Sequence, residues 1–179
     1  MRIIAGERKG CRLFAPTWEG LRPTSDRLRE TLFNVLRDDV VGARWLDGCA
    51  GTGAIGLEAI SRGAMTVTFV ECDHRAIALI RKNIAQCRTE SRAVVVEGAL
   101  PDGLARSIES PCFDVCVLDP PYEFDTKKIG DILTGVKPYV AQSGLIVLER
   151  PRRAAVVEVP GLVTQRCINS GDSALYFYG

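Results

Sequence analysis

Apolar residues fall into short continuous runs from residue 43 onward, and amphipathic stretches separate these runs. The runs cover residues 43–47, 66–71, 93–97, 113–119 and 144–149 and are rich in Val, Ile, Leu and Phe. Such runs are typical of strands buried on both faces, so they predict a parallel sheet with helices on both sides. The helices are expected to end near residue 62, to cover 74–87 and 100–108, and to lie near 127–133. Beyond residue 154, further apolar runs around the turn sequence NSGDS (169–173) predict an antiparallel edge.

The first forty residues follow a different pattern. Residues 2–16 alternate between apolar and polar positions, with Gly6 and Gly10 at turns or bulges, and predict a short β-ribbon. Residues 24–40 carry an apolar stripe at helical spacing, which predicts a helix packed on the core. The stripe consists of Leu28, Leu32, Val35 and Leu36, and the candidate caps are Thr24, Ser25 and Asp26. We therefore expect an N-terminal extension over residues 1–40, packed on a domain over residues 41–179.

Length and composition limit the functional classes. A chain of 179 residues with 46% apolar and 25% charged residues is expected to bury a core, and no run is long enough to span a membrane. The first ten residues lack the apolar segment of a secretory signal, so we expect a cytoplasmic protein. Seven cysteines without a CxxC pair are expected to be buried free thiols. His74 is the single histidine, which disfavours a zinc site and a Ser-His or Cys-His nucleophile; no metal is expected.

The charge is distributed unevenly. Residues 1–37 carry eight basic and four acidic residues, although the whole chain has a net charge of only +1. A basic extension on a slightly acidic body is what a polyanion-binding arm would look like. An ordinary solvated surface remains the alternative at this stage. Arg150, Arg152 and Arg153, after the fifth predicted strand, form a second candidate basic patch.

A glycine-rich loop follows the first predicted strand. Residues 51–56, GTGAIG, match the G-x-G-x-x-G pattern, which dinucleotide-binding proteins share. Asp47 at the mouth of this loop would repel a pyrophosphate and suits a cationic ligand such as S-adenosylmethionine. Glu71 ends the next strand and can accept hydrogen bonds from ribose hydroxyls. The alternatives are that Asp47 caps the next turn and that Glu71 pairs with a surface arginine.

The stretch FDVCVLDPPYEF (113–124) ends a strand on an acid, two prolines and an aromatic ring. Asp119 and the carbonyl of Pro120 offer two acceptors, which complement the two hydrogens of a planar amino group. The two prolines stiffen the chain and lack N–H donors. Tyr122 offers a ring on which a base can stack. Together these groups predict a site that turns the amine of a nucleobase towards the methyl group of a sulfonium, without a metal.

Residues 119–122 match the (D/N)PP(Y/F) motif of amino-methyltransferases that act on nucleobases. With MRIIAGERKG (1–10), LRPTSDRLRETLFN (21–34), AGTGAIGLEAISRGA (50–64) and FVECD (69–73), the chain resembles the RsmD family of bacterial 16S rRNA (guanine(966)-N(2))-methyltransferases along nearly its whole length. The resemblance implies a Rossmann-like class I S-adenosylmethionine-dependent fold. That fold has a mostly parallel seven-stranded sheet with helices on both faces, preceded by a β-ribbon and a helix. It also implies 16S rRNA or the small ribosomal subunit as partner, and a monomer is expected.

The resemblance also implies roles for individual residues. The catalytic residues would be Asp119, Pro120 and Tyr122. The cofactor-binding residues would be Asp47, Gly48, Ala50, Gly51, Gly53, Glu71, Cys72, Gly98 and Ala99. The substrate- and RNA-binding residues would be Arg8, Lys9, Arg12, Arg22, Thr24, Arg27 and Pro121. Two positions depart from the family pattern: Gly98 stands where an Asp or Asn often binds adenine, which leaves Glu97 or the Ala99 amide, and Gly48-Cys49 replaces an apolar-aromatic pair.

Three other functions stay open from the sequence. A DNA adenine or cytosine amino-methyltransferase would use the same motif, although 179 residues leave no room for a large target-recognition domain. A nicotinamide-dependent oxidoreductase would use the glycine loop, but Asp47 disfavours it. A catalytically silent RNA-binding module is the last. In each nucleic-acid case, a target base in a duplex would have to flip out to reach the motif.

Overall fold

The computed structural model describes residues 1–21, 24–107 and 112–179. The strands are β1 (Arg44–Gly48), β2 (Thr66–Glu71), β3 (Ala93–Glu97), β4 (Phe113–Leu118), β5 (Val140–Pro151), β6 (Thr164–Ser170) and β7 (Ser173–Tyr178). The α-helices are α1 (Asp26–Val35), α2 (Ala54–Ser61), α3 (His74–Cys87), α4 (Asp102–Ser107) and α5 (Thr126–Val136). Two 3₁₀ turns, η1 (Glu90–Arg92) and η2 (Lys137–Tyr139), precede β3 and β5.

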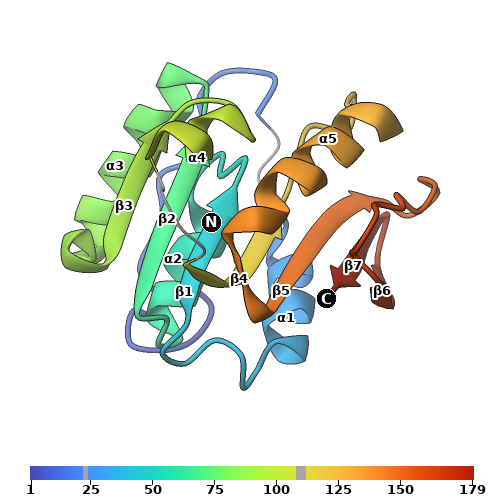
Figure 1. The fold of residues 1–179 in the computed structure, drawn as a ribbon. Coiled ribbons are helices and arrows are strands. Elements are labelled where there is room, and N and C mark those ends of the chain that lie inside the picture. The colour runs from blue at the N-terminus through green and yellow to red at the C-terminus, as the bar shows by residue number, and fades with distance from the viewer. Residues whose placement is uncertain (22–23, 108–111) are drawn as a thin grey trace.

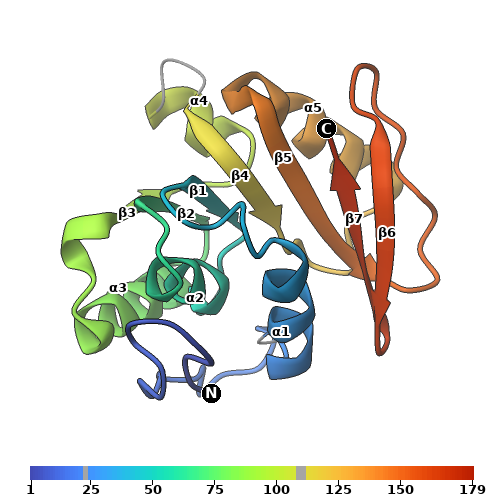
Figure 2. The ribbon, with the colours of Figure 1, turned by 90° about the horizontal axis from the view of Figure 1, so that it is seen from below.

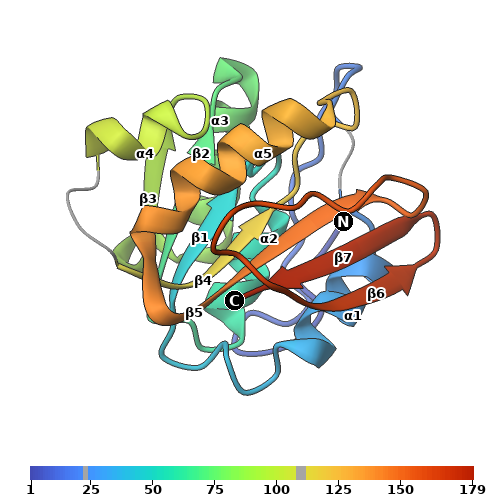
Figure 3. The ribbon, with the colours of Figure 1, turned by 45° about the vertical axis from the view of Figure 1, so that its right-hand side comes forward.

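The strands form a seven-stranded sheet in the order β3-β2-β1-β4-β5-β7-β6 (Figure 1). From β3 to β5 all neighbours run parallel, whereas β7 pairs antiparallel with both β5 and β6. The antiparallel edge comes forward in Figure 3. The chain winds outward from β1 to β3 and then returns to β4 beside β1. In open α/β sheets, ligands bind at the carboxyl edge next to such a switch point. The predicted fold class is thus confirmed.

The core has one part on each face of the sheet. Helices α1, α2 and α3 cover one face, and α4 and α5 cover the other (Figure 2). Consecutive residues of β1 show the division, because Trp45 packs in the first part and Leu46 in the second. Neighbouring side chains of a strand point to opposite faces, so a strand between two helical layers has to be apolar throughout.

The helix α1 forms as its apolar stripe predicts. Leu28, Leu32 and Leu36 are buried against the sheet. The N-cap is Ser25, whose hydroxyl accepts a hydrogen bond from the N–H of Leu28 at 3.2 Å. Of the three candidate caps, the structure therefore selects Ser25. Thr24 is left available for another contact.

The predicted N-terminal ribbon is a short hairpin and not a pair of strands. One antiparallel bridge joins Arg2 to Arg12. The N–H groups of Ile4 and Ala5 donate to the carboxylate of Glu58 in α2, at 2.7 and 3.0 Å. Backbone hydrogen bonds join the two arms, such as the one from the N–H of Ile3 to the carbonyl of Cys11, but no strand is assigned within residues 1–21. The buried carboxylate of Glu58 fixes the hairpin to α2.

The segment that follows the hairpin, here called the strap (residues 13–21), runs along α3 from its end to its start. The N–H of Phe14 donates to the side chain of Asn83 at 2.7 Å. Further along, the Arg75 guanidinium lies 5.2 Å from the centre of the Trp18 ring. The strap therefore leads from the hairpin to the carboxyl edge of the sheet. The expected division of the chain at residue 40 stays a prediction.

All seven cysteines are free thiols, but only Cys87 and Cys116 are buried. Cys72 and Cys167 are exposed, so the expectation of buried thiols is wrong for them. Cys72 follows the carboxyl end of β2, where the chain leaves the core. Within the described ranges no helix is both long and apolar enough to cross a membrane.

Candidate active site

A cavity of about 470 Å³ lies at the carboxyl edge of the sheet. This volume is typical of small-molecule sites, which span about 300–1,000 Å³. The strap and the start of α1 form one side of its wall. The segments after β1, β2, β3 and β4 form most of the rest, and the end of β5 completes it. The cavity thus lies at the edge of the sheet where the sequence predicts the catalytic and cofactor-binding residues.

Asp119 lies one residue beyond β4 and is fixed by its backbone and its side chain. Its N–H donates to the carbonyl of Gly48 at 3.2 Å, which keeps the end of β4 beside β1. The hydroxyl of Thr24 donates to Oδ2 of its carboxylate. Both residues line the cavity, as does Pro120. The segment just before α1 therefore reaches the DPPY motif (residues 119–122) directly.

Tyr122 is held at its hydroxyl end. The hydroxyl donates to Oε1 of Glu149 at 2.6 Å and lies 3.0 Å from the hydroxyl oxygen of Ser173. Glu149 ends the apolar part of β5 and Ser173 starts β7, so both belong to the sheet. A ring anchored in this way has a defined plane at the cavity wall.

The backbone of the DPPY loop is fastened by the next residue of β5. Nη2 of Arg150 donates to the carbonyl of Phe124 at 2.8 Å, and Nη1 lies 3.5 Å from the carbonyl of Pro121. Arg150 is only 7% exposed. It therefore does not belong to a basic surface patch, which leaves Arg152 and Arg153 as the exposed members of that predicted group.

Glu71 is oriented by three backbone donors. Its Oε2 accepts from the N–H of Gly51 at 2.8 Å, and its Oε1 accepts from the N–H groups of Cys72 and Asp73 at 2.7 and 3.0 Å. Each carboxylate oxygen has two acceptor positions, so Oε2 keeps one for a ligand in the cavity that Glu71 lines. Among the described residues, Glu71 forms no ion pair with an arginine.

Asp47 is buried behind the glycine loop and binds the first turn of α2, whose N-cap is Gly53. It is 1% exposed, and its Oδ2 accepts from the N–H of Gly56 at 2.8 Å. Burial raises the pKa of Asp47 well above its ordinary value, although the hydrogen bond from Gly56 acts in the opposite direction. Since Asp47 and Glu71 already bind the amides of Gly56 and Gly51, the loop does not present these donors to a phosphate.

The residues predicted to bind a cofactor fall into two groups. Glu71, Cys72, Gly98 and Ala99 line the cavity, whereas Asp47, Gly48, Ala50, Gly51 and Gly53 do not. The strap explains part of this difference. Leu21 Cδ1 lies 3.2 Å from the point where a Cβ on Gly51 would be, so the side chain of Leu21 covers the loop.

The segment after β3 shows which group can replace the Asp or Asn that the family often has at the position of Gly98. The carboxylate of Glu97 pairs with Arg81 at 2.6 Å and does not line the cavity. Gly98 and Ala99 do line it, and the N–H of Gly98 donates to the carbonyl of Glu71 at 2.8 Å. Of the two substitutes that the sequence left open, the backbone at Ala99 is thus the one at the cavity.

Comparison with known proteins agrees with this geometry. The family model described as conserved hypothetical protein 95 matches residues 1–179. A Haemophilus influenzae protein named ribosomal RNA small subunit methyltransferase D is 39% identical over 151 residues, which cover 83% of this chain and 78% of the relative. The Escherichia coli protein of the same name is 36% identical over 160 residues, 89% of this chain and 79% of the relative. The chain belongs to the RsmD family.

The fold of this RsmD family member is shared with solved methyltransferase structures. A structure from Escherichia coli described as a candidate methyltransferase, yhhF, superposes with a TM-score of 0.83 at 33% identity and covers 99% of this chain and 96% of its own. A Thermus thermophilus protein, TTHA0928, superposes with a TM-score of 0.81 at 31% identity, with 99% and 98% coverage. The first structure supports the Rossmann-like methyltransferase fold, and the second, described as a hypothetical protein, has the same fold.

The residues predicted to bind RNA occupy separate places in this RsmD family member. Thr24 and Pro121 line the cavity, and Arg27 is exposed on α1. Arg8, Lys9 and Arg12 belong to the hairpin, and Nη2 of Arg8 lies 3.4 Å from the carbonyl of Arg88 beyond the end of α3. The cavity is at the start of this 14-residue helix, so about 20 Å of helix separates the two places. Arg22 lies outside the described residues.

Several residues at the site escaped sequence analysis. Glu149, Ser173 and Leu21 line the cavity but were not predicted there. Glu149 had a usable signal, since it is an acid at the end of the fifth predicted apolar run, beside the strand that ends at Asp119. Ser173 and Leu21 had none, because their positions depend on the antiparallel pairing of β7 and on the path of the strap.

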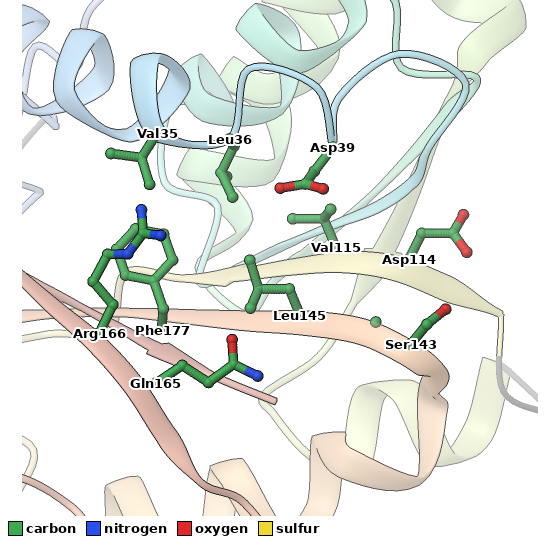
Figure 4. Close-up of a pocket in the computed structure, with 11 residues that line it drawn as sticks. Val35, Leu36, Asp39, Asp114, Val115, Ser143, Leu145, Gln165, Arg166 and Phe177 are labelled. Atoms are coloured by element: carbon green, nitrogen blue, oxygen red, sulfur yellow. The ribbon is translucent and has the colours of Figure 1, made fainter.

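A second cavity of about 380 Å³ lies away from this site (Figure 4). It is bounded by Leu36 and Asp39 after α1, by Asp114 near the start of β4, and by Gln165 and Arg166 of β6. Asp114 lies at the amino end of β4, and Gln165 and Arg166 lie at the start of β6 in the antiparallel edge. None of the residues predicted for catalysis lines it.

Proposed function

We propose that this RsmD family member transfers a methyl group from S-adenosylmethionine to the exocyclic N2 amino group of a guanine in small-subunit rRNA. The observation that carries the proposal is that Glu71 and the DPPY loop line one cavity. Glu71 can accept hydrogen bonds from a ribose, and the DPPY loop can accept them from an amine. One cavity with both groups suits a methyl donor that contains a nucleoside and a substrate that is a base. The relatives named ribosomal RNA small subunit methyltransferase D support rRNA as the substrate.

The residues of the cavity fit the proposed cofactor. Oε2 of Glu71 would accept from a ribose hydroxyl, and the backbone N–H of Ala99 would contact the adenine. Cys72 and Gly98, which line the cavity, would enclose the nucleoside. Gly48, Ala50, Gly51 and Gly53 do not line it, and they would contact the amino acid portion only with the side chain of Leu21 moved off the loop. A loop whose amides already bind Asp47 and Glu71 favours a phosphate-free, cationic ligand over a dinucleotide. When bound, S-adenosylmethionine supplies a methyl group on a positively charged sulfur.

The DPPY loop would prepare the amine. Asp119 and the carbonyl of Pro120 accept the two hydrogens of N2, which turns its lone pair towards the methyl group. The bound cofactor would supply the methyl group to N2 and leave as a neutral thioether, and Asp119 or solvent would take the surplus proton of N2. Alignment of this kind supplies about 7–11 kcal/mol in well-oriented systems. The carboxylate of Asp119 also stabilises the positive charge that develops on nitrogen.

The surrounding contacts would keep these acceptors in place. Thr24 orients the carboxylate of Asp119, Arg150 fixes the loop carbonyls, and the Tyr122 ring, anchored at Glu149, would stack against the base. A guanine within a helix cannot reach this loop, so the target base is unpaired or flips out. Arg8, Lys9, Arg12, Arg22 and Arg27 are then candidates for contacts with RNA phosphates outside the cavity.

A transfer assay with labelled methyl donor tests the proposal. The acceptors are naked small-subunit rRNA, assembled small subunits that lack the modification, large-subunit rRNA and genomic DNA, with Asp119→Ala as the control protein. Nucleoside mass spectrometry should find N2-methylguanosine confined to small-subunit material and absent with Asp119→Ala. Methyladenine or methylcytosine in DNA would replace the proposal with a DNA amino-methyltransferase.

A further inference from the structure

Glu149 carries an acceptor that nothing in the described chain satisfies. It is 2% exposed and lines the cavity. Its Oε1 binds the hydroxyl of Tyr122, but its Oε2 is buried and has no hydrogen-bond partner among the described residues. Native structures leave few buried acceptors in this condition, and the usual reasons are strain, a catalytic role, or a bound water or ion. Because Glu149 lines the cavity, we consider a bound ligand. The ligand has to bring a hydrogen-bond donor.

The position of Glu149 shows which ligand this is. Leu118 pairs with Leu148 in the parallel register of β4 and β5. The next residues along the chain are Asp119, just beyond the end of β4, and Glu149, two residues before the end of β5. If the register continues, they lie on neighbouring strands about 4.8 Å apart and on the same face. A base whose amine binds Asp119 can therefore place one of the two ring atoms that flank the amine near Glu149.

We propose that Glu149 selects guanine by accepting the hydrogen on N1 of the base, an inference that rests on the proposed function. Guanine carries N1–H directly beside its N2 amino group. Adenine has an unprotonated nitrogen, N1, beside its amine, and cytosine has one at N3, so a carboxylate would face a lone pair in both. Glu149 therefore attracts one base and repels the other two. Oε2 is buried in this structure, so the proposal requires the side chain of Tyr122 or Glu149 to move when the base enters.

The role differs from that of a structural anchor for Tyr122. An anchor affects every base equally, because it acts through the position of the ring. A carboxylate that accepts the hydrogen on N1 changes the rate of transfer only for bases that carry this hydrogen. The two roles are separated by a substrate that keeps the 2-amino group and lacks the N1 hydrogen. 2-Aminopurine has this structure, and its fluorescence also reports stacking.

The experiment compares small-subunit rRNA with guanine or with 2-aminopurine at the target position. The wild-type protein and Glu149→Gln are assayed for kcat/KM on both. A glutamine still accepts from Tyr122, but it offers an N–H to the unprotonated N1 of 2-aminopurine and loses the charged acceptor for guanine. We expect Glu149→Gln to lower kcat/KM for guanine by about 10- to 100-fold, the range for a hydrogen bond to a charged group. We expect the ratio of guanine to 2-aminopurine to fall by at least about 10-fold.

The ratio of kcat/KM for guanine to that for 2-aminopurine does not depend on the fraction of folded protein, because both substrates are assayed with the same preparation. Two variants serve as controls. Tyr122→Phe and Ser173→Ala remove hydroxyls around Glu149 and leave its carboxylate, so both should keep the wild-type ratio within about 3-fold. Binding of 2-aminopurine RNA, followed by fluorescence, should become tighter with Glu149→Gln than with the wild type.

Each outcome bears on the proposal. If Glu149→Gln lowers transfer to both bases equally, Glu149 is an anchor for Tyr122 and the specificity role is wrong. If Tyr122→Phe changes the ratio as much as Glu149→Gln, the discrimination comes from the ring. If the wild-type protein forms no N2-methylguanosine on any rRNA, the proposed function fails first, and the choice of guanine fails with it.

Discussion

The hydroxyl of Thr24 donates a hydrogen bond to the carboxylate of Asp119, which lies 95 positions further along the chain. The contact joins the start of α1 to the end of β4 and makes the N-terminal extension part of the cavity wall. One oxygen of the carboxylate thereby has a defined direction. Because the cap of α1 is Ser25, the hydroxyl of Thr24 does not serve the helix.

Removal of this hydroxyl should slow methyl transfer without lowering the affinity for the cofactor. For Thr24→Val we expect kcat to fall by about 10-fold or more, since a hydrogen bond to a charged group contributes about 1.5–3 kcal/mol. Steady-state kinetics and calorimetric binding of S-adenosylmethionine measure both quantities. Thr31→Val is the matched control, because Thr31 lies on α1 outside the cavity and donates to the carbonyl of Arg27. An equal loss in both variants would point to a general effect on α1.

Asp119 and Glu71 should separate chemistry from cofactor binding. We expect Asp119→Ala to lower kcat by at least about 100-fold, the range for loss of one preorganised stabilising group, with nearly unchanged cofactor affinity. Asp119→Asn keeps an acceptor and should retain part of the activity. Glu71→Gln should raise the Kd for S-adenosylmethionine first. If Asp119→Ala abolished cofactor binding to the same degree as Glu71→Gln, the division of roles would be wrong.

The fold was predictable because one periodic signal dominates it. Each parallel strand is apolar on both faces, as Trp45 and Leu46 illustrate, and each amphipathic segment between strands became a helix. The N-terminal hairpin was not predictable in detail. Its alternating pattern suits a ribbon, but the buried carboxylate of Glu58, which fixes it to α2, lies more than fifty positions away in the sequence.

The candidate site was predictable only where a residue ends a strand. Asp119 and Glu71 end apolar runs, so the sequence predicts that both lie at the carboxyl edge of the sheet. Glu149 met the same condition and was overlooked because no motif marks it. Arg150 was assigned to the surface because its charge suggested exposure, whereas the carbonyls of the DPPY loop supply its partners. Contacts of this kind depend on which loop folds over which strand.

Gly56 should tolerate no side chain, because α2 packs directly on β2. A Cβ at this position would lie 2.3 Å from Cε1 of Phe69 and 2.7 Å from Cγ1 of Val67. We expect Gly56→Ala to lower the free energy of unfolding by about 1–3 kcal/mol, as overpacked cores do. Gly130→Ala in α5 is the control, since its Cβ would meet only Val157 at 3.8 Å. That change should stabilise the helix by about 0.5–1 kcal/mol, and urea unfolding measures both.

Asp73 should make the stability of α3 depend on acid. It caps the helix and accepts from the N–H of Arg75 at 2.8 Å, and the Arg75 side chain lowers the pKa of Asp73 to about 2. A lowered pKa means that the contribution is complete above the ordinary value near 4 and is lost as the pH falls through about 2. At pH 6, Asp73→Ala should cost about 1 kcal/mol, the usual value of an N-cap.

The difference between wild type and Asp73→Ala should therefore shrink between pH 5 and pH 2. Urea unfolding of both proteins across this range measures it. Asp131→Ala is a suitable comparison, because its pair with Lys127 lies on the surface of α5 and no cap depends on it. A difference that stays constant down to pH 2 would mean that the charge of Asp73 contributes nothing beyond its hydrogen bond.

The hairpin and the exposed residues after β5 are competing candidates for contact with RNA phosphates. Replacement of Arg8, Lys9 and Arg12 by Gln tests the first, and replacement of Arg152 and Arg153 by Gln tests the second. Each lost phosphate contact lowers the slope of log K against log salt by about 0.7–0.9. If the hairpin binds RNA, its triple variant should lower the slope by about 2 and weaken binding at low salt, with unchanged affinity for S-adenosylmethionine.

The two surfaces differ in what they imply about the substrate. The hairpin lies about 20 Å from the cavity along α3, so a contact there requires an RNA that extends well beyond the target base. A short stem-loop RNA that carries only the target loop should then bind to the wild-type protein and to the triple variant with equal affinity. Longer rRNA should distinguish them. If the triple variant binds long rRNA with the wild-type salt slope, while the Arg152 and Arg153 variant loses slope, the RNA path runs past β5 and the hairpin serves only to hold α2 and α3 together.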